Sequence, residues 1–310
     1  MKTCELGASG LRVSRLAYGC WRLAGIEGKR WEDPSVGRRA VHEAIDAGYT
    51  FLDLADIYGN GECERIVGDV LRERPGARDS LVMASKCGIR RQGDPAGSVG
   101  RYDFSAGHIL RSVEGILQRL GLETLDLLML HRPDYLMEPE EVAGALASLR
   151  ASGKVRHFGV SNFRPSQVDL LARACGFPLV THQVELSLMH LATLEDGTLD
   201  QCKVLHMTPT AWSPLGRGVL GDGSLEGHPE PVAARAARLH AELDAMAPGM
   251  GLDRVGVALA WVLRHPSRPV PVVGSVSPAR IRSMARAADV EMGREDWYRL
   301  LVASRGERVP

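Results

Sequence analysis

Leu125-Asp126-Leu127-Leu128-Met129-Leu130 is a short apolar stretch that points to the fold class. From Leu127 onward every position is apolar, so a strand formed here would be buried on both of its faces. A run of this length is typical of a strand and shorter than most helices. Strands buried on both faces occur in parallel sheets whose two sides are covered by helices. We therefore predict a parallel sheet.

Seven further short apolar runs are strand candidates, and amphipathic stretches with helical spacing lie between them. These strand candidates are residues 15–18, 50–53, 81–85, 155–160, 179–184, 208–212 and 269–273. Helices are predicted near 62–74, over 109–120 between the caps Ser105 and Gly121, and over 142–149 before Ser152-Gly153.

Strict alternation of strand and helix indicates a parallel sheet, and eight such units in 310 residues favour a closed barrel. We predict an α/β fold, a (β/α)8 TIM barrel formed by residues 1–310 as one domain. An N-terminal hairpin at the turn 7–10 and extra C-terminal helices would complete it. A doubly wound open sheet is the structural alternative.

The overall composition argues against several classes of partner. Basic and acidic side chains number 38 each, so no basic surplus indicates nucleic acid or an anionic membrane surface. No apolar run approaches the roughly 18 residues of a membrane-spanning helix, and the first ten residues do not resemble a signal peptide. The six cysteines are scattered, which favours free thiols and disfavours a zinc site. We expect a cytoplasmic protein without a bound metal.

Ionisable side chains stand at the ends of three successive strand candidates. Asp53 ends the second with Tyr58 close behind it, Lys86 ends the third, and His131 ends the fourth. Each alone has a plain explanation, such as a cap, a solvated lysine or a satisfied core histidine. In a (β/α)8 barrel, however, the C-terminal ends of the strands meet at one mouth, where active sites lie. Together the four residues indicate a catalytic site.

These four side chains suit the protonation of a carbonyl oxygen. The pKa of tyrosine is about 10, and a nearby ammonium such as Lys86 lowers it by favouring tyrosinate. Asp53 can hold a buried Lys86 in its charged form, and His131 can donate a hydrogen bond to the carbonyl oxygen. Because no protein side chain supplies a hydride, a nicotinamide or a flavin is required.

Four segments resemble the aldo-keto reductase family. They are 48–60 (GYTFLDLADIYGN), 84–88 (ASKCG), 130–134 (LHRPD) and 153–163 (GKVRHFGVSNF). The similarity extends over nearly the whole chain and is greatest to a bacterial subgroup of oxidoreductases. It implies an NADP(H)-dependent enzyme that reduces small aldehydes or ketones to alcohols. Tyr58 would be the proton donor, Asp53 and Lys86 would tune it, and His131 would orient the carbonyl.

The resemblance also implies a binding site for NADP(H). Ser161, Asn162 and Gln183 would hold the nicotinamide carboxamide, although Ser161-Asn162 can also be read as a helix N-cap. Trp212 would stack on the nicotinamide, where tyrosine is commoner in the family, and a core tryptophan is the alternative. The predicted cofactor-binding residues are Gly19, Cys20, Trp21, Asp53, Ser161, Asn162, Gln183, Trp212, Ser213, Pro214, Leu215, Gly216, Gly218, Gly274, Ser275, Ser277 and Arg280.

The glycine-rich segment 213–221 (SPLGRGVLG) contains a G-x-G-x-x-G pattern at Gly216, Gly218 and Gly221. A Rossmann dinucleotide motif needs a helix directly after the glycines, and 222–229 predict none. The resemblance implies instead that this part of a long loop over 216–231 folds over the pyrophosphate. Glycines there let backbone N–H groups approach the anion.

After the eighth strand, Ser277-Pro278 predicts a helix N-terminus at the barrel mouth, a position that favours phosphate. By resemblance, Ser275 and Arg280 would bind the adenosine 2′-phosphate, and a plain surface arginine is the alternative. Many relatives carry lysine where this chain has Gly274, and a polar adenine contact where it has Met284. The loss of that lysine should weaken the preference for NADP(H) over NAD(H).

The substrate is predicted to be a small-molecule carbonyl or alcohol that contacts Trp21, Tyr58 and His131. Tyr135 and Met189-His190 also lie near strand ends, and such aromatic and thioether groups indicate an apolar pocket. We expect no nucleic-acid or membrane partner, and a monomer or weak oligomer. Two functions of other classes are alternatives: a nucleotide-sensing regulatory subunit with the same fold, and a barrel hydrolase or lyase that works without a nucleotide.

Overall fold

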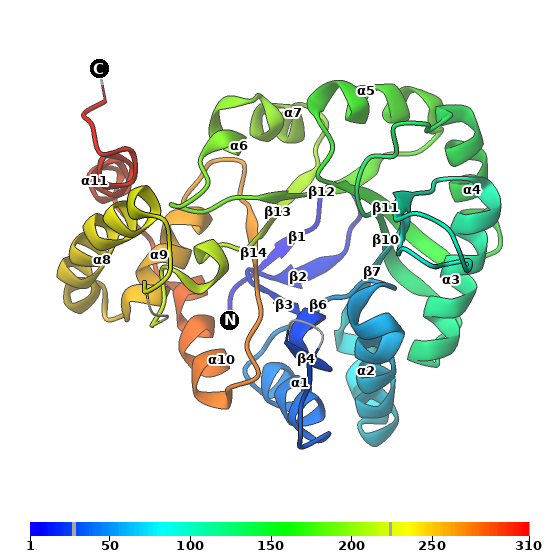
Figure 1. Cartoon of the computed structure of the whole chain (residues 1–310), viewed down its shortest axis with the longest axis horizontal. Helices are drawn as coiled ribbons and strands as arrows, with labels where there is room; N and C mark the ends of the chain where they lie inside the picture. Colours follow the sequence, from blue (N-terminus) through cyan, green and yellow to red (C-terminus); the bar gives the residue numbers. More distant parts are fainter. Residues whose placement is uncertain (27–28, 223–224, 310) are drawn as a thin grey trace.

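Eight parallel strands close into a barrel in the computed structural model, which describes residues 1–26, 29–222 and 225–309 (Figure 1). Each strand pairs with the next one in sequence, and the last pairs back to the first. The barrel strands are β3 (Ala17–Gly19), β6 (Phe51–Asp53), β7 (Val82–Cys87), β10 (Leu125–Leu130), β11 (Val155–Ser161), β12 (Leu179–Glu185), β13 (Thr208–Trp212) and β14 (Val270–Val273). The predicted (β/α)8 TIM barrel is confirmed, and the open-sheet alternative is wrong.

The strand boundaries agree with the apolar runs to within two residues. The first strand differs at its start, since it was expected from Arg15 and begins at Ala17. The guanidinium of Arg15 donates hydrogen bonds to the carbonyl oxygens of Leu263 and Arg268, both at 3.1 Å. Arg15 therefore anchors the chain to the segment before β14 and lies ahead of the strand.

Helices surround the barrel on its outer side (Figure 1). They are α1 (Val36–Asp46), α2 (Glu62–Glu73), α3 (Ala106–Leu120), α4 (Pro139–Ala151), α5 (Pro165–Ala174), α6 (Ala192–Glu195), α7 (Thr198–Val204), α8 (Glu230–Met250), α9 (Arg254–Leu263), α10 (Pro278–Ala285) and α11 (Arg294–Arg305). The predicted caps of α3 are present. The side chain of Ser105 accepts from the backbone N–H of His108, and Gly121 ends the helix with a φ of 68°.

Several short elements lie on the loops. Two antiparallel hairpins follow β3 and β7, namely β4 (Gly25–Ile26) with β5 (Lys29–Arg30) and β8 (Ile89–Arg90) with β9 (Arg101–Tyr102). The 3-10 helices are η1 (Cys20–Arg22), η2 (Tyr58–Gly61), η3 (Pro75–Ser80), η4 (Gly216–Gly218) and η5 (Arg286–Asp289). Of these, η1 directly follows β3, and η2 and η4 come a few residues after β6 and β13, so all three lie at the mouth of the barrel.

An N-terminal hairpin of β1 (Thr3–Glu5) and β2 (Arg12–Ser14) closes the other end of the barrel. Its buried side chains Leu6 and Val13 pack in one cluster with residues of the barrel interior. Gly7 has a φ of 55°, and a Cβ added there would lie 2.2 Å from the carbonyl oxygen of Val180 near the start of β12. Only glycine fits at this contact, which explains how the hairpin can lie so close to the strands.

The C-terminal part adds helices beyond the alternating pattern. Trp261 on α9 and Trp297 on α11 stack with ring centroids 5.1 Å apart, and each indole N–H donates to the other's carbonyl oxygen at 3.1 Å. The loop expected over 216–231 is shorter, because α8 already begins at Glu230. Pro231 fits in the first turn of α8, where its missing N–H has no helical partner. Within the described ranges, no helix combines the length and apolarity needed to span a membrane.

Candidate active site

Four ionisable side chains lie together at the barrel end opposite the hairpin. Asp53 is the last residue of β6, Lys86 lies near the end of β7, His131 directly follows β10, and Tyr58 begins η2. These three strands are neighbours in the barrel. Side chains that point inward near their C-terminal ends therefore converge, and the structure brings together the four residues that the sequence singled out.

Lys86 is at the centre of this group. Its side chain is fully buried, and its Nζ donates to Asp53 Oδ2 at 2.9 Å, to the Leu54 carbonyl oxygen at 2.8 Å and to Tyr58 Oη at 3.1 Å. An ammonium has three N–H donors, so each has a partner. The other carboxylate oxygen of Asp53 accepts from Gln183 Nε2 at 2.8 Å. The anion that balances the lysine is thus itself held in place.

Burial and the ion pair act in opposite directions on the pKa of Lys86. Desolvation is the largest single influence and lowers the pKa, but Asp53 and Tyr58 together outweigh it and raise the pKa above its ordinary value. Lys86 is therefore charged at neutral pH. This agrees with the expectation that Asp53 holds a buried lysine in its ammonium form.

Tyr58 has a raised pKa, so the expectation of a lowered one is wrong. Desolvation is the largest influence and raises the pKa, Lys86 lowers it, and Asp53 raises it. The ammonium acts in the expected direction, but burial outweighs it. Tyr58 is consequently a neutral phenol at neutral pH, which can donate its proton.

His131 is a neutral imidazole beside the Tyr58 ring. The two ring centroids are 5.9 Å apart in an edge-on arrangement. Burial lowers the pKa of His131 well below its usual range, and the charges of Lys86 and Arg132 lower it further. Its Nδ1 is buried and has no hydrogen-bond partner among the described residues. A neutral imidazole carries one donor and one acceptor nitrogen, so this ring has unused hydrogen-bonding capacity.

Asn162 links three predicted site residues. Its Nδ2 donates to Ser161 Oγ at 2.8 Å and to the His131 carbonyl oxygen at 3.1 Å, and its Oδ1 accepts from Trp212 Nε1 at 2.9 Å. It has a φ of 61°, in the left-handed region that asparagine tolerates better than most residues. The helix-cap interpretation is wrong, because Ser161 ends β11 and the N-cap of α5 is Arg164.

The glycine-rich loop after β13 contains a run of left-handed backbone conformations. These are Ser213 at 49°, Gly216 at 56°, Arg217 at 58° and Gly218 at 101°. An added Cβ on Gly216 would lie 2.6 Å from the side chain of Met189, so this loop rests on the turn that follows β12. Backbone N–H groups in such conformations form concave sites for anions. In this loop, however, the N–H groups of Gly216 and Gly218 already donate to the carbonyl oxygens of Ser213 and Leu215, at 2.9 and 3.1 Å.

A Rossmann arrangement is excluded here. After Gly221, the described residues contain no α-helix until α8 begins at Glu230. Of the segment 222–229 expected to lack a helix, residues 223–224 lie outside the described residues.

Arg280 forms an ion pair that the sequence did not indicate. Its Nη2 lies 2.6 Å from Asp222 Oδ2, and the two side chains are 60% and 73% exposed. Exposed pairs of this kind contribute only about 0–1 kcal/mol, so a phosphate can displace the carboxylate. Ser275 is held nearby, since its carbonyl oxygen accepts from Tyr18 Oη at 2.8 Å and its Oγ from the N–H of Ser277 at 3.2 Å.

The structure gives a reason for two departures from the family pattern. A Cβ on Gly274 would lie 3.1 Å from the Gly19 carbonyl oxygen, which is closer than an ordinary contact, so a lysine there would need the end of β3 to shift. Met284 is buried in the core and does not present its side chain to solvent. The side chain of Cys20 is also fully buried, which leaves its backbone for contact with a ligand.

The predicted substrate contacts are more exposed than an apolar pocket requires. Trp21 in η1 is 56% exposed and Tyr135 is 86% exposed. His190 Nδ1 lies 3.8 Å from a carboxylate oxygen of Glu185. Arg132, which sequence reasoning passed over, adjoins His131 and acts on its pKa. Its position directly after His131 was the available signal.

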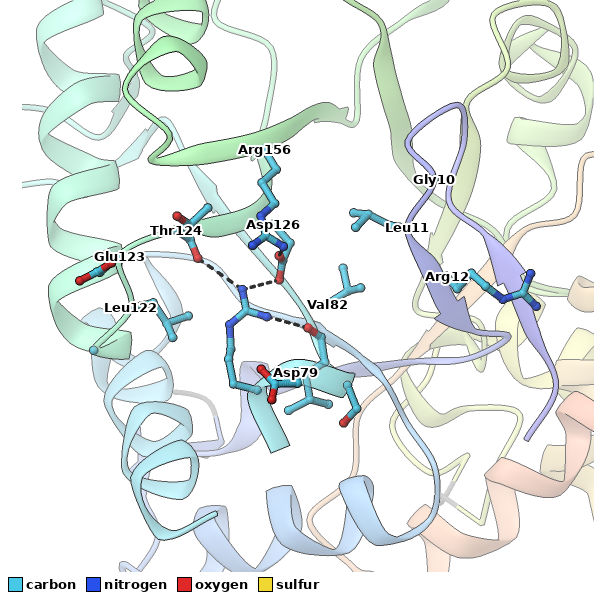
Figure 2. A pocket seen from close by; sticks show the side chains of 14 residues that line it. Gly10, Leu11, Arg12, Asp79, Val82, Leu122, Glu123, Thr124, Asp126 and Arg156 are labelled. Atoms are coloured by element: carbon cyan, nitrogen blue, oxygen red, sulfur yellow. Dashed lines mark hydrogen bonds and ion pairs between the residues drawn. The ribbon is translucent and has the colours of Figure 1, made fainter. Parts of the chain in front are cut away.

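A cleft of about 690 Å³ lies at the hairpin end of the barrel, away from these residues (Figure 2). Figure 2 shows Arg156 reaching toward Asp126 near the hairpin turn. The buried carboxylate of Asp126 accepts from Arg156 and pairs with Arg78, both at 2.9 Å, and accepts from the N–H of Met83 at 2.8 Å. Such networks at the N-terminal face of a barrel support stability, so this cleft is not the candidate active site.

Comparisons with known proteins agree with this geometry. The model of the Aldo/keto reductase family matches residues 15–302. A 6-dehydroglucose reductase of Novosphingobium aromaticivorans is 41% identical over 99% of this chain and 96% of its own length. The oxidoreductase YdhF of Escherichia coli is 39% identical over 98% of each chain, in line with the bacterial subgroup that the motifs indicated.

Solved structures show the same fold. A glycerol dehydrogenase of Gluconobacter oxydans superposes with a TM-score of 0.87 and 26% identity, covering 99% of this chain and 97% of its own. A thermostable aldo-keto reductase in complex with the inhibitor epalrestat superposes with a TM-score of 0.83 and 25% identity, covering 98% of this chain and all of its own.

Proposed function

Because this chain belongs to the aldo/keto reductase family, we propose that it is an NADP(H)-dependent enzyme that reduces small aldehydes or ketones to alcohols. One observation carries the proposal. The ammonium of Lys86 is fully buried, and its three hydrogen bonds go to Asp53, Leu54 and Tyr58. A buried cation placed beside a neutral phenol suits a reaction in which the phenol gives up its proton.

Tyr58 is the proposed proton donor. When it protonates a carbonyl oxygen it becomes tyrosinate, and the Lys86 ammonium 3.1 Å away stabilises that negative charge. Asp53 keeps Lys86 charged, and Gln183 fixes the carboxylate of Asp53. In alcohol oxidation the same tyrosinate accepts the proton. Tyr58 and Lys86 would therefore serve both carbonyl reduction and alcohol oxidation.

His131 is the proposed group that orients the carbonyl. Its neutral imidazole lies edge-on to Tyr58 and can donate one hydrogen bond to the carbonyl oxygen. Asn162 donates to the backbone carbonyl oxygen of His131 and accepts from the indole N–H of Trp212, so it links the backbone at His131 to Trp212. A substrate oxygen between Tyr58 and His131 would have donors on two sides.

The residues at the mouth fit a nicotinamide dinucleotide, which supplies the hydride when bound. Trp212 offers an indole ring held by Asn162, and the carbonyl oxygen of the Gln183 amide remains for a carboxamide because the nitrogen is bonded to Asp53. Glycines with left-handed backbone at 216 and 218 would let the loop lie close to a pyrophosphate. Ser275 and Arg280 would bind the 2′-phosphate, with the guanidinium released from Asp222.

The names of two relatives and one solved neighbour support a hydroxylated substrate. Relatives from Novosphingobium aromaticivorans and Agrobacterium fabrum are both named 6-dehydroglucose reductase, and one solved neighbour is a glycerol dehydrogenase. By similarity, we propose that this enzyme acts on small carbonyl compounds that carry hydroxyl groups.

The direct test is titration of the protein with NADPH and, separately, NADH, followed by an aldehyde screen. Quenching of tryptophan fluorescence measures binding, and the absorbance of NADPH measures turnover. Tight binding of NADPH, weaker binding of NADH and turnover of at least one small aldehyde are expected. Binding of neither nucleotide would overturn the proposal.

A further inference from the structure

A cleft of about 540 Å³ lies at the hairpin end of the barrel, between the start of β1, the end of α9 and the segment that follows η5. Its volume is that of a small-molecule site. Among the described residues, five charged side chains line it, and four of them are cationic. The cations are Lys2, Arg15, Arg264 and Arg268, and the acidic residue is Glu291. We call this site the basic cleft.

Arg15 is a buried cation without a counter-ion among the described residues. Five aspartate, glutamate, lysine or arginine side chains are buried in the described parts of the chain. Four of them have an oppositely charged partner, in the pairs Lys86–Asp53, Arg119–Glu64, Arg78–Asp126 and Arg156–Asp126. The fifth is Arg15, which is 8% exposed and pairs with no carboxylate that the structure describes. Because burying a charge is costly unless it is paired and hydrogen-bonded, an anionic ligand beside Arg15 would be favourable.

The contacts of Arg15 fix its guanidinium without neutralising it. Its Nη1 donates to the Arg268 carbonyl oxygen at 3.1 Å and to Cys4 Sγ at 3.9 Å, and its Nη2 donates to the Leu263 carbonyl oxygen at 3.1 Å. Carbonyl oxygens at a helix end carry only partial negative charge. A guanidinium has five N–H donors, so these contacts use three. The Nε atom has no partner among the described residues and is not enclosed by protein, so donors remain for a ligand in the basic cleft.

Arg264, Arg268 and His265 add further donors to the basic cleft. Both arginines are exposed, and neither pairs with a carboxylate in the described ranges. Arg264 Nε donates to the Met292 carbonyl oxygen at 2.8 Å. Burial lowers the pKa of His265, so its ring is neutral at neutral pH. Its Nδ1 accepts from the N–H of Ser267 at 3.2 Å, which leaves the ring proton on Nε2 as a donor.

The acidic side chains near these cations leave the excess of positive charge in place. Glu291 is 91% exposed, and its Oε1 lies 3.8 Å from the Nζ of Lys2, which is itself 55% exposed. Exposed pairs of this kind are weak. Asp289, just before the lining segment, accepts from the backbone N–H of Lys2 at 3.1 Å. Although the whole chain has a net charge of zero, this cleft is locally basic.

We propose that the basic cleft binds a small polyvalent oxyanion, one that carries a phosphate group or several carboxylates. Arg15 would contact it from the buried side, and Arg264 and Arg268 from the exposed side. A guanidinium presents a fork of donors that matches two oxygen atoms of such an anion. The ligand would supply the missing counter-charge of Arg15. It would also join the hairpin, α9 and the segment after η5. The site is separate from the candidate active site and does not depend on the proposed reductase function.

The experiment measures the binding of three anions by titration calorimetry at low ionic strength. Pyrophosphate and citrate are polyvalent, and acetate is monovalent. NADPH is added in excess beforehand, so that phosphate sites at the mouth of the barrel are occupied. We expect pyrophosphate, citrate or both to bind once per chain, at least about 10-fold more tightly than acetate. The affinity should fall as salt is added, because the contacts are between charges.

Variants locate the bound anion. Arg264→Met and Arg268→Met keep a long stem, remove the charge and should each weaken binding by about 10-fold, the scale of one charged hydrogen bond. Arg173→Met is the matched control, because it removes an exposed arginine of α5 that does not line the cleft. It should leave the affinity unchanged. The affinity for NADPH should be the same in all of these proteins.

Arg15→Met needs a different readout, because Arg15 also holds the end of α9 and its loss can lower stability. Urea unfolding is therefore compared with and without pyrophosphate or citrate within each protein. A ligand that binds only the folded state raises the unfolding midpoint. The bound anion should raise the midpoint of the wild type and raise that of Arg15→Met much less, whatever the starting stability of the variant.

The outcomes are distinct. Tighter binding of pyrophosphate identifies a phosphate group as the ligand, and tighter binding of citrate identifies a polycarboxylate. The inference is overturned if neither anion binds, if acetate binds as tightly, or if Arg264→Met and Arg268→Met bind like the wild type. A midpoint shift of wild-type size in Arg15→Met would equally overturn it. Failure of NADPH binding or of aldehyde reduction would overturn the proposed function and leave this test of the basic cleft intact.

Discussion

Asp53→Asn removes the carboxylate that keeps the buried Lys86 charged while preserving the shape of the side chain. The amide can still accept a hydrogen bond, but it no longer balances the ammonium, whose other partners are the Leu54 carbonyl and the Tyr58 hydroxyl. Desolvation, the largest influence on Lys86, is then opposed only weakly. We therefore expect Lys86 to be neutral in the folded variant, one proton fewer than in the folded wild type.

The size of the effect follows from the cost of losing that proton. The ordinary pKa of lysine is 10.5, and one pH unit corresponds to about 1.4 kcal/mol. Folding with Lys86 neutral therefore costs about 5 kcal/mol at pH 7 and about 2 kcal/mol at pH 9. Breaking a buried ion pair costs about 3–5 kcal/mol. We expect the variant to lose about 3–5 kcal/mol of unfolding free energy at pH 7.

The sign of the pH dependence is opposite to that of the intact pair. In the wild type the pKa of Lys86 is raised in the folded protein. The stability that this site adds to the folded state is therefore fully present below the lysine pKa of the unfolded chain. It is lost only as the pH rises through the raised value. In Asp53→Asn the unfolded chain binds the extra proton. Stability then rises with pH, and the difference from wild type shrinks by about 1.4 kcal/mol per unit between pH 7 and 9.

Urea unfolding at pH 7, 8 and 9, followed by tryptophan fluorescence, measures this difference. Gln183→Met is the matched control, because it removes the other hydrogen bond to Asp53 without changing any charge. Its unfolding free energy should run parallel to that of the wild type. Tyrosinate absorbance shows whether the proton leaves Tyr58 or Lys86. A constant difference between Asp53→Asn and wild type would refute the reasoning, since Lys86 would then stay charged without Asp53.

Four further substitutions test the proposed roles. Tyr58→Phe keeps the ring that packs on His131 but removes the proton, so kcat should fall about 100-fold or more; turnover near the wild-type rate would show that another group donates. Arg280→Ala should weaken the binding of NADPH by about 10-fold and that of NADH little. Asp222→Asn frees the guanidinium and should tighten the binding of NADPH. Titration with both nucleotides checks this, and equal losses of affinity in Arg280→Ala would exclude a 2′-phosphate contact. Trp212→Phe keeps a stacking ring without the N–H and should weaken the binding of both nucleotides alike, by about 3- to 10-fold. An effect on NADPH binding alone would contradict the stacking role.

The barrel could be predicted because its strands are separate apolar runs. The run at 125–130 is β10 itself, and 208–212 is β13, since a strand buried on both faces needs little beyond a short apolar segment. Asp53, Lys86 and His131 could be placed together for a related reason. They end consecutive strands, and the closure of a parallel barrel brings neighbouring strand ends to one mouth.

The contacts that support these residues could not be predicted in the same way. Gln183 and Asp53 are 130 positions apart, and Asn162 and Trp212 are 50 apart. Asn162 reaches its partners with a φ of 61°, and no residue pattern distinguishes this conformation from an ordinary turn. Such hydrogen bonds depend on how each loop leaves its strand, which is decided by packing after the barrel has closed.

The pKa of Tyr58 shows why burial in the folded protein matters for the mechanism. The charges on Asp53 and Lys86 can be read from the sequence, but the desolvation that outweighs them exists only in the folded protein. A resting phenol with a raised pKa is a proton donor at neutral pH, and its conjugate base would be unfavourable there without a cation. In the proposed reaction Lys86 would act after the proton has moved, by stabilising the tyrosinate that carbonyl reduction produces. In that proposed role Lys86 lowers the energy of the state with tyrosinate, and the resting phenol would keep its proton until a carbonyl oxygen is there to take it.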